Sequence, residues 1–596
     1  MDQEIAGYYT LELKNYRNID KHLRKKVRWI SIIRSVVFIC LVVSFFYTSQ
    51  MGWLLSTSAI VILLSGFLYF IKIHIQAEKD KKRNGILIAF CENELKALKH
   101  EFGHFDNGEE FMDTLHDFSF DLDIFGEGSL FQFLNRTSTV SGKKVLSRWM
   151  QNPSQDKSEI ENLQDAVKEM SKLRKWRMKF LSYGKVFEES TLQYREIANW
   201  SLKYFSFKNL KFTNILRYVL PALTLASFIP VLFGMAYLIL YVFVLLQWFS
   251  MYFYRKQIKG YFRFFSKKAQ LIEKYKTLLN EIEQQEFHSS WIKKQQSKAL
   301  TPHSACKTIN RLSKLVRQFE YRQNILVGFV LNSVFLWDIR CVYLLHKWHS
   351  ENKEKLMDWL AAIENMDALI SLANYADNHP RFSYPKVNKN DYSMVAQGLG
   401  HPLLHPGKRI CSDFEICNQP KVIIVTGANM AGKSTFLRSV GVNLVLAGAG
   451  APICATIFRY SPIGLYTNMR TTDSLFKDES YFFAELKRLG VMLERLKKEE
   501  RLFVILDEML KGTNSVDKLN GSRELVKKMV HHQAVALVAT HDLKLAEMEK
   551  ELPDSVINKC FEIHIKDDEL TFDYILTDGV TESMNATFLM KKMGII

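Results

Sequence analysis

Two pairs of long apolar segments interrupt the mixed polar pattern of the first half of the chain. In the first pair, residues 29–47 contain one charged side chain, Arg34, and residues 52–71 contain none. The second pair lies within residues 218–254, which carry no charged side chain. A helix of about 20 apolar residues spans the hydrocarbon core of a bilayer. Each pair therefore predicts a transmembrane helical hairpin.

Basic residues flank both predicted hairpins on their outer sides. The linker of the first hairpin, Thr48–Gln50, and the turn of the second, Pro230–Gly234, are uncharged. This arrangement follows the positive-inside rule and predicts a multi-pass protein of a bacterial-type inner (cytoplasmic) membrane with its soluble parts in the cytoplasm. Buried helices in a large soluble core stay an alternative, because Arg34 weakens the first span. The basic flanks are Lys21, Arg24, Lys25, Lys26 and Arg28, then Lys72, Lys79, Lys81, Lys82 and Arg83, then Lys203, Lys208, Lys211 and Arg217, and finally Arg255, Lys256, Lys259, Arg263, Lys267 and Lys268.

The remaining sequence before residue 381 has helical periodicity. A third apolar run, Ile325–Trp337, is too short to span a bilayer and predicts a core helix. Ser158 and Glu161 have the spacing of a capping box and predict the start of another helix. The predicted domain boundaries are 1–83 for a basic segment with the first hairpin (spans about 29–47 and 51–71), 84–213 for a first helical part, 214–256 for the second hairpin, 257–380 for a second helical part, and 381–596 for a C-terminal domain.

The pattern changes in the C-terminal domain, where short β-branched runs alternate with helical segments. Val422–Val425, Leu502–Leu506 and Ala534–Ala539 are such runs, and this alternation is typical of a mainly parallel sheet. Further on, Cys560–Ile565 and Leu570–Leu576 alternate apolar and polar residues and predict an antiparallel hairpin.

Length, net charge and cysteine content indicate the number of domains, the kind of partner and the state of the thiols. A chain of 596 residues predicts two to four domains. The formal net charge of +17 favours an anionic partner, either nucleic acid or a lipid surface. The eight cysteines are scattered without a C-x-x-C pair, which is typical of reduced thiols in a cytosolic setting rather than of a zinc site.

A glycine-rich segment follows the first of these β runs and opens a helix. Its Gly-x-x-x-x-Gly-Lys-Ser pattern predicts a phosphate-binding loop, in which backbone N–H groups and the helix N-terminus hold the phosphates of ATP. Lys433 is expected to contact the β and γ phosphates, and the Ser434 hydroxyl is expected to ligate Mg²⁺. The predicted nucleotide-binding residues of this segment are Gly427, Ala428, Asn429, Met430, Ala431, Gly432, Lys433, Ser434 and Thr435.

Two further β runs end in candidate catalytic side chains. Asp507 and Glu508 follow Leu502–Leu506, and the pair predicts a Mg²⁺ ligand at Asp507 and a general base that polarises water at Glu508. His541 follows Ala534–Ala539, where a side chain can sense the γ-phosphate. Together these motifs predict an α/β P-loop ATPase domain after an all-α core and lever region that carries two transmembrane hairpins.

These motifs resemble those of the MutS family of DNA mismatch-repair ATPases. TGANMAGKSTFLRS resembles the family's phosphate-binding segment, LDEMLKGTNSVD its second motif, and ATHDL its histidine motif. Gly128–Pro153 resembles the start of the family's helical core. Asp478–Glu485 is similar to a signature region that faces the partner's nucleotide, so the resemblance implies a homodimer in which Ser480 completes the other subunit's pocket.

The departures from the family pattern concern the region that reads DNA. The first hairpin occupies the place of the mismatch-recognition and connector domains, and the second is inserted among helices that lead to a DNA clamp in the family. We therefore expect a membrane-anchored MutS-like ATPase that uses ATP and Mg²⁺, contacts the lipid bilayer, and binds DNA with weak or no mismatch discrimination. An ATP-switched membrane scaffold that does not handle DNA is an alternative, and a transporter-like machine is a further one.

Mismatch readers of the family wedge a Phe-x-Glu element beside the unpaired base. Two or three Phe-x-Glu matches are expected by chance with 42 phenylalanines, so the four matches found carry little weight. These matches are Phe90–Glu92, Phe125–Glu127, Phe187–Glu189 and Phe483–Glu485.

Overall fold

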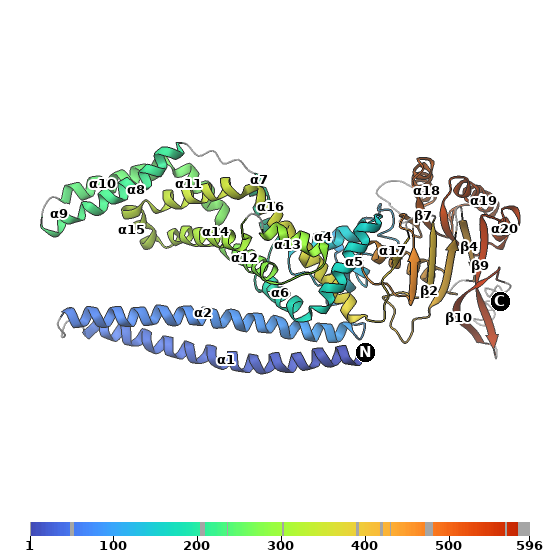
Figure 1. Cartoon of the computed structure of the whole chain (residues 1–596), viewed down its shortest axis with the longest axis horizontal. Helices are drawn as coiled ribbons and strands as arrows, with labels where there is room; N and C mark the ends of the chain where they lie inside the picture. Colours follow the sequence, from blue (N-terminus) through green and yellow to red (C-terminus); the bar gives the residue numbers. More distant parts are fainter. Residues whose placement is uncertain are drawn as a thin grey trace.

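The helical and the sheet-containing parts of the protein lie end to end along its longest axis (Figure 1). The computed structural model describes residues 2–47, 53–202, 209–234, 237–266, 268–300, 303–388, 392–417, 421–428, 431–470, 481–566 and 569–581. The helices before the sheets are α1 (Asp2–Tyr47), α2 (Trp53–Ala97), η1 (Glu109–Phe111), α3 (Leu130–Leu134), α4 (Val140–Gln151), α5 (Lys157–Lys172), α6 (Arg174–Val186), α7 (Thr191–Leu202), α8 (Leu210–Ala226), α9 (Phe228–Leu232), α10 (Tyr237–Phe253), α11 (Arg255–Phe265), α12 (Ala269–Gln284), α13 (Ser290–Leu300), α14 (Ala305–Glu320), η2 (Tyr321–Gln323), α15 (Ile325–Phe335) and α16 (Trp337–Asn378).

Helices α1 and α2 form one long antiparallel hairpin that extends away from the sheets. The 46 residues of α1 make a rod of about 69 Å at 1.5 Å per residue. The first predicted span is therefore the distal part of a much longer helix. Near the base, Ile5, Tyr9 and Leu13 follow helical spacing and pack against Leu87 and Cys91 of α2. This packing explains why the polar residues before the apolar segment are also helical.

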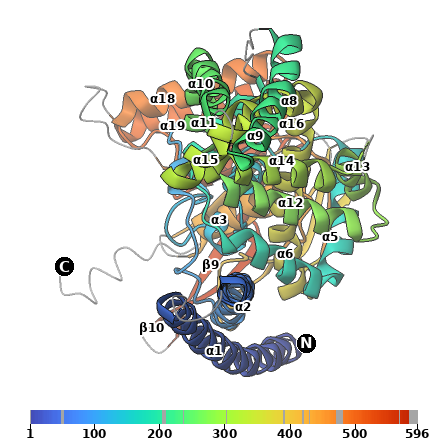
Figure 2. The same ribbon diagram turned by 90° about the vertical axis from the view of Figure 1, so that its left-hand side faces the viewer.

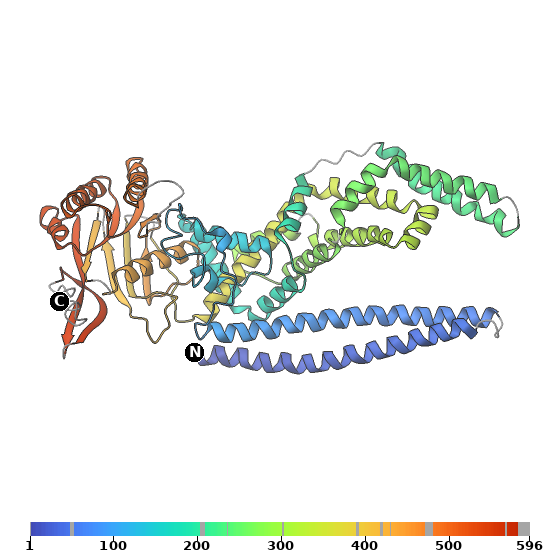
Figure 3. The same ribbon diagram turned by 180° about the vertical axis from the view of Figure 1, so that it is seen from behind.

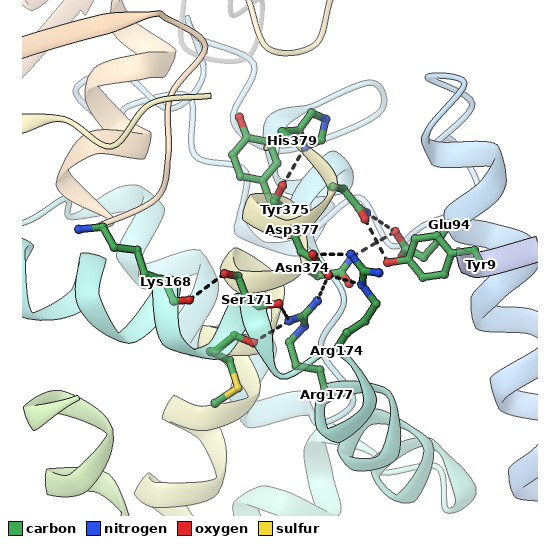
Figure 4. A network of polar contacts seen from close by, with 12 residues as sticks. Tyr9, Glu94, Lys168, Ser171, Arg174, Arg177, Asn374, Tyr375, Asp377 and His379 are labelled. Atoms are coloured by element: carbon green, nitrogen blue, oxygen red, sulfur yellow. Dashed lines mark hydrogen bonds and ion pairs between the residues drawn. The ribbon is translucent and has the colours of Figure 1, made fainter. Parts of the chain in front are cut away.

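A polar network ties the base of this hairpin to α6 and α16 (Figure 4). The Tyr9 hydroxyl donates to the Asn378 side chain at 3.0 Å. The amides of Asn374 and Asn378 donate to Glu94 of α2. Arg174 of α6 pairs with Asp377 of α16 at 2.6 Å. Because these groups are largely buried, the hairpin is joined to the long helix α16 through contacts that are costly to break.

The first side of the second hairpin is interrupted at Ser227, and its second helix ends just before Gly234, which has φ of 75°. Helices α8 and α9 form one side and α10 the other, and α11 turns by 68° from α10. Its tip lies at the same end of the molecule as the tip of the α1–α2 hairpin, far from the sheets (Figures 1 and 3). Many large apolar side chains are exposed toward both tips, among them Phe38, Val43, Phe46, Leu238, Leu245 and Phe249.

Three helical stretches in the described part of the chain are long and apolar enough to cross a bilayer, judged by length and composition. They are Gln3–Phe46, Ser58–Ala97 and Leu210–Val231. Two bent pairs, α10 with α11 and α15 with α16, raise the number to five if each pair is one span. The predicted linker Thr48–Gln50 lies outside the described residues.

The prediction of a buried core helix at residues 325–337 is wrong. Helix α15 packs against α8 and α10, but Ile325, Leu326, Phe329 and Val330 are exposed. The length of this segment argued against a helix that crosses the whole bilayer. Length does not indicate whether other parts of the protein cover the apolar side chains. The apolar run also ends within a bend, because α16 starts at Trp337 and turns by 81° from α15.

Helix α16 connects this bend with the sheets and lies against many other helices. Its Asp367 is fully buried and accepts hydrogen bonds from the backbone and hydroxyl groups of Ser138 and Thr139 at the start of α4. Gly142 is required there, because a Cβ atom would lie 2.3 Å from the Asp367 carboxylate. The neighbouring helix α5 begins at Lys157 with Asp156 as its N-cap, so the predicted Ser158 capping box is wrong. The Asp156 carboxylate accepts from the Glu159 N–H and satisfies that end instead.

The C-terminal part contains a mainly parallel sheet, as predicted. The six-stranded sheet has the order β10-β9-β4-β8-β7-β6, with only the β9–β10 pair antiparallel, and a four-stranded sheet has the order β1-β5-β2-β3. The predicted antiparallel hairpin is thus confirmed. The elements are β1 (Lys386–Val387), β2 (Ser393–Leu399), β3 (Ser412–Cys417), β4 (Lys421–Gly427), α17 (Lys433–Gly448), β5 (Ile457–Tyr460), β6 (Gly464–Asn468), α18 (Tyr481–Lys497), β7 (Leu502–Asp507), α19 (Ser515–His531), β8 (Val535–Thr540), η3 (Leu543–Glu547), α20 (Met548–Glu551), β9 (Val556–Lys566) and β10 (Glu569–Asp578).

Candidate nucleotide-binding site

Three parallel strands end at the same edge of the large sheet and gather the predicted site residues there. Thr426 of β4 is in register with Thr540 of β8, and Asp507 of β7 is in register with Ala539. The interiors of these strands are buried β-branched and aliphatic residues, as expected for a parallel sheet covered on both faces. The segments that follow the strands therefore converge at the carboxyl edge of the sheet, where ligands bind in open α/β sheets.

The glycine-rich turn after β4 approaches other backbone closely. Gly427 has φ of 149°, and a Cβ atom there would lie 3.1 Å from the Phe561 carbonyl oxygen. Gly432 is the N-cap of α17 with φ of 104°, a conformation that favours glycine. Ala428 and Ala431 fit within the turn, while the predicted residues Asn429 and Met430 lie outside the described residues. The turn thus presents the N-terminus of a 16-residue helix to the edge.

Lys433 lies at the start of α17 and is 5% exposed. Its Nζ donates to the carbonyl oxygens of Gly427 at 2.6 Å and Ala428 at 2.8 Å. Burial lowers the pKa of the ammonium, and the carboxylates of Glu508 and Asp507 oppose that shift. The lysine therefore lies near the predicted acidic residues and bonds acceptors that anionic oxygens of a ligand can replace.

The predicted Mg²⁺ ligands lie on the two elements that meet at the edge. Ser434 and Thr435 are exposed in the first turn of α17, and Asp507 is half-buried at the end of β7. Hydroxyl and carboxylate oxygens are the donors that Mg²⁺ prefers, together with water and phosphate oxygens. The donor set and the neighbouring lysine fit a magnesium–nucleotide pair, which Ser434 and Asp507 would hold.

Glu508 and His541, the two predicted catalytic residues, are brought into contact. The His541 Nδ1 atom lies 2.9 Å from Glu508 Oε1. Glu508 has φ of 56°, and its N–H donates to the Ala539 carbonyl oxygen at 3.0 Å. A non-glycine residue in this conformation costs about 1 kcal/mol or more and is concentrated at functional sites. The backbone therefore directs the carboxylate toward His541 rather than along the strand.

A cavity of about 630 Å³ opens beside the turn and contains residues that the motifs did not identify. Tyr574 of β10 lies against Gly432, where a Cβ atom would be 3.0 Å from its ring. His401 is a second wall residue, and burial lowers the pKa of its imidazole to about 4. The cavity is lined by Leu399, His401, Leu404, Lys408, Ile410, Ser412, Ala428, Gly432, Lys433, Ser434, Thr435, Phe436, Ser439, Glu508, Phe561 and Tyr574.

Glu485 supports the segment that follows Glu508. The Glu485 side chain is 2% exposed, and its two oxygens accept from the backbone N–H groups of Leu510 at 2.6 Å and Lys511 at 3.1 Å. Burial raises the pKa of this carboxyl group, and the two backbone hydrogen bonds oppose the shift. Helix α18 thereby fixes the loop after β7. Of the predicted signature segment Asp478–Glu485, residues Asp478, Glu479 and Ser480 lie outside the described residues, and the rest belongs to α18.

The mixed sheet, the glycine-rich turn and the helical region before them fit a MutS-like architecture. Residues 423–591 match the family model described as MutS domain V, and residues 113–187 match MutS domain III. These matches support a relation of the two segments to the MutS family, in agreement with the resemblance of their motifs.

Curated relatives agree with this relation over part of the chain. The chain is 29% identical over 253 residues to the DNA mismatch repair protein MutS of Thermotoga petrophila, covering 42% of this chain and 31% of the relative. It is 28% identical over 249 residues to the MutS protein of a Thermotoga species, strain RQ2, covering 41% and 30%. The MutS protein of Protochlamydia amoebophila is 26% identical over 251 residues, covering 41% and 29%. The match therefore spans about a third of the length of these relatives.

Proposed function

We propose that this chain is a membrane-anchored, Mg²⁺-dependent ATPase of the MutS type that binds DNA with weak or no mismatch discrimination. In this proposal it is a multi-pass protein of a bacterial-type inner membrane, with its soluble parts in the cytoplasm. The observation that carries the proposal is the cluster of Lys433, Asp507, Glu508 and His541 at one end of a chain whose other end exposes two apolar hairpins.

The chemistry proposed for the cluster is hydrolysis of the terminal phosphate. Bound ATP would supply the phosphoanhydride bond that is cleaved, and Mg²⁺ would neutralise the negative charge that develops on the phosphates. Lys433 binds phosphate oxygens, and Glu508 orients a water molecule and accepts its proton. His541 holds the Glu508 carboxylate in place. Ser480 is proposed to complete the pocket of a second subunit, which makes the active form a homodimer.

DNA binding is proposed to use cationic side chains rather than base contacts. The net charge of +17 attracts phosphates, and the relatives named above are mismatch repair proteins. The lining of a groove of about 800 Å³ between the start of α1 and the α5–α6 turn includes Lys172, Arg174, Lys175 and Lys179, and also Asp377, which pairs with Arg174. Lys172 and Lys175 are exposed there, so they are available to phosphate oxygens.

A second candidate is an ATP-switched membrane scaffold that does not handle DNA. The observation that favours this candidate is the exposed apolar surface toward the tips of the two hairpins, which occupy the place of DNA-binding elements in the family. The two candidates share the ATPase chemistry and the membrane attachment. They differ only in whether DNA is a ligand.

A gel-shift panel separates the two candidates. The purified protein in nanodiscs is mixed with duplex, single-stranded, forked and four-way-junction DNA, each with and without Mg·ATP. The first proposal expects shifts that ATP alters and that weaken as salt rises. Lys433→Ala should keep binding without the response to ATP. Failure to shift any of these DNAs at low salt, while ATP is still hydrolysed, would leave the scaffold.

A further inference from the structure

We infer that α15 is a third membrane-contacting element, a half-helix that inserts among lipid acyl chains beside the α8–α10 hairpin. This inference rests on the membrane attachment in the proposed function. Residues 324–337 carry no charged side chain. The 11 residues of α15 form a helix of about 16 Å, which is about half of a hydrocarbon core of roughly 30 Å.

The first observation is the exposed apolar surface of α15. Ile325 is 85% exposed, Leu326 78%, and Phe329 and Val330 more than half. A large contiguous apolar surface marks a site of interaction with protein or membrane. The end-on view shows α15 grouped with α8, α9 and α10 at the end of the molecule that carries the hairpin tips (Figure 2).

The second observation is that α15 packs against α10 of the second hairpin, next to its exposed apolar surface. The Trp248 indole N–H donates to the Ser333 hydroxyl at 3.1 Å, and its ring lies 5.5 Å from the Phe329 ring. Gln247 lies ten residues after the start of α10 at Tyr237, which is about 15 Å from the tip end of that helix. If the hairpin spans, the contacts of Gln247 lie near the middle of the bilayer.

The third observation is how the backbone is satisfied at the bend between α15 and α16. Leu336 has φ of 49°, so the regular helix ends there. The fully buried Gln247 accepts from the Leu336 N–H and donates to the Val334 carbonyl oxygen, each at 3.0 Å. Asn332 accepts from the Asp338 N–H at 2.9 Å. An unpaired backbone group is strongly disfavoured in hydrocarbon, and interrupted helices persist where protein groups replace the lost partners.

Charge selects the bilayer over a second copy of this chain as the occupant. Helix α14 leads to α15 and exposes four basic residues, and α11 at the base of the hairpin exposes four more. Such residues favour anionic headgroups beside an inserted apolar segment and repel an identical surface. The exposed basic residues are Lys307, Arg311, Lys314 and Arg317 on α14, and Arg255, Lys256, Lys259 and Arg263 on α11.

The test measures contact with lipid at single labelled positions. In the full chain, the cysteines that are not buried (Cys40, Cys306, Cys411 and Cys417) are replaced by serine, and Leu326→Cys is labelled with the fluorophore NBD. The protein is reconstituted in phosphatidylcholine–phosphatidylglycerol vesicles with or without bromine on the acyl chains. Leu245→Cys, exposed on α10, is the matched lipid-facing control. Leu115→Cys, exposed outside the hairpins, is the matched aqueous control.

The inference expects Leu326→Cys to match Leu245→Cys, with blue-shifted emission, quenching by brominated lipid and little quenching by iodide. Quenching by brominated lipid at 245 but not at 326 overturns the inference and leaves the hairpin anchor intact. A label at 326 shielded from both quenchers means that protein covers α15, and it also overturns the inference. Absence of lipid quenching at 245 as well overturns the membrane part of the proposed function, and the inference with it.

Discussion

His541 Nδ1 lies 2.9 Å from Glu508 Oε1, and this contact joins the ends of two neighbouring parallel strands. An ionised carboxylate only accepts hydrogen bonds, so Nδ1 must donate in this pair. A neutral imidazole then keeps Nε2 as an acceptor. The geometry assigns the histidine to positioning the carboxylate, and a hydrogen bond from its Nε2 to a phosphate oxygen would require the imidazolium form, in which both ring nitrogens donate.

Replacement of Glu508 should separate nucleotide binding from turnover. Glu508→Gln keeps the size of the side chain but removes the base, so turnover should fall about 100-fold or more, the scale of general-base catalysis. Binding of Mg·ATP should remain, whereas Lys433→Ala should lose it. Steady-state phosphate release and a fluorescent-nucleotide titration measure the two effects. Glu524→Gln, an exposed glutamate on α19, is the matched control, and equal turnover of Glu508→Gln and this control would remove the catalytic assignment.

Replacement of His541 should depend on the presence of Glu508. If the histidine acts by orienting the carboxylate, His541→Ala should lower kcat in the parent protein and have little further effect in Glu508→Gln. Residues that act as one unit are non-additive in this way. A double-mutant cycle in phosphate-release rate makes the measurement. Full additivity would show that the 2.9 Å contact does not couple the two side chains in turnover.

Much of this site could be predicted because its motifs are local. Asp507 ends β7 and Glu508 follows it, while Lys433 begins α17 after the short turn that follows β4. Parallel strands bring these ends to one edge. Tyr574 could not be predicted in this way. The pairing of β10 with β9 shifts register between Phe572 and Leu576, so strand alternation does not indicate where the Tyr574 ring points.

Long-range packing also explains the errors in the helical part. Pattern and length identified the apolar residues of α15, but their exposure depends on which surfaces of α8 and α10 are already occupied. The predicted cap at Ser158 had the right spacing for a capping box, yet Asp156 accepts the N–H bond two residues earlier. Glu485 is the last residue of the predicted signature region, Asp478–Glu485. Its hydrogen bond to the loop after Glu508 depends on how α18 lies against that loop, which the motif does not indicate.

Acid should destabilise the junction between α16 and the sheets through His379. Burial lowers the pKa of this imidazole from 6.5 to about 4, the hydrogen bond to the Tyr375 carbonyl oxygen opposes the shift, and His100, Arg409 and Arg136 favour the neutral form. The folded state then holds fewer protons than the unfolded state between pH 6.5 and 4, so stability is lost as the pH falls through that window.

The expected loss is about 1–2 kcal/mol of unfolding free energy at pH 5, after allowance for partial solvent access to the ring. His379→Gln keeps a donor for the carbonyl oxygen and should flatten the fall in Tm between pH 7 and 5. Thermal unfolding followed by circular dichroism measures it. His22→Gln, on the exposed surface of α1, should leave the slope unchanged. A parental slope in the His379→Gln protein would contradict the assignment.

Topology is tested with single cysteines at two positions in a background without native thiols. The charge bias predicts that Ser49→Cys is outside and that Lys82→Cys, on the exposed surface of α2, is cytoplasmic. An impermeant thiol reagent added to intact cells should label the first variant only, and cell lysis should make the second reactive. Labelling of Lys82→Cys alone in intact cells would reverse the orientation. A chain that stays in solution after detergent-free lysis and centrifugation would contradict the spans.

DNA binding should be electrostatic and nearly blind to a single mismatch. Two of the four Phe-x-Glu matches start with a phenylalanine that packs against other side chains of the protein. Phe125 is 6% exposed, and the Phe90 ring lies 6.3 Å from the Tyr9 ring at the base of the α1–α2 hairpin. A side chain used in this packing is not free to wedge beside a base.

We therefore expect a matched and a mismatched duplex to differ by less than about tenfold in Kd, or roughly 1.4 kcal/mol. Both should bind more weakly as salt rises, with a linear relation between the logarithms of affinity and salt concentration. Lys172→Glu with Lys175→Glu should weaken both duplexes equally and reduce the salt slope if, as proposed, the groove on α5 and α6 binds phosphates. Lys497→Glu with Lys498→Glu, at the exposed end of α18, makes the same charge change away from that groove and should have a smaller effect. Fluorescence anisotropy across a salt series measures all three proteins. Much tighter binding of the mismatched duplex, lost in Phe90→Ala, would mean that this phenylalanine leaves the hairpin base to read DNA.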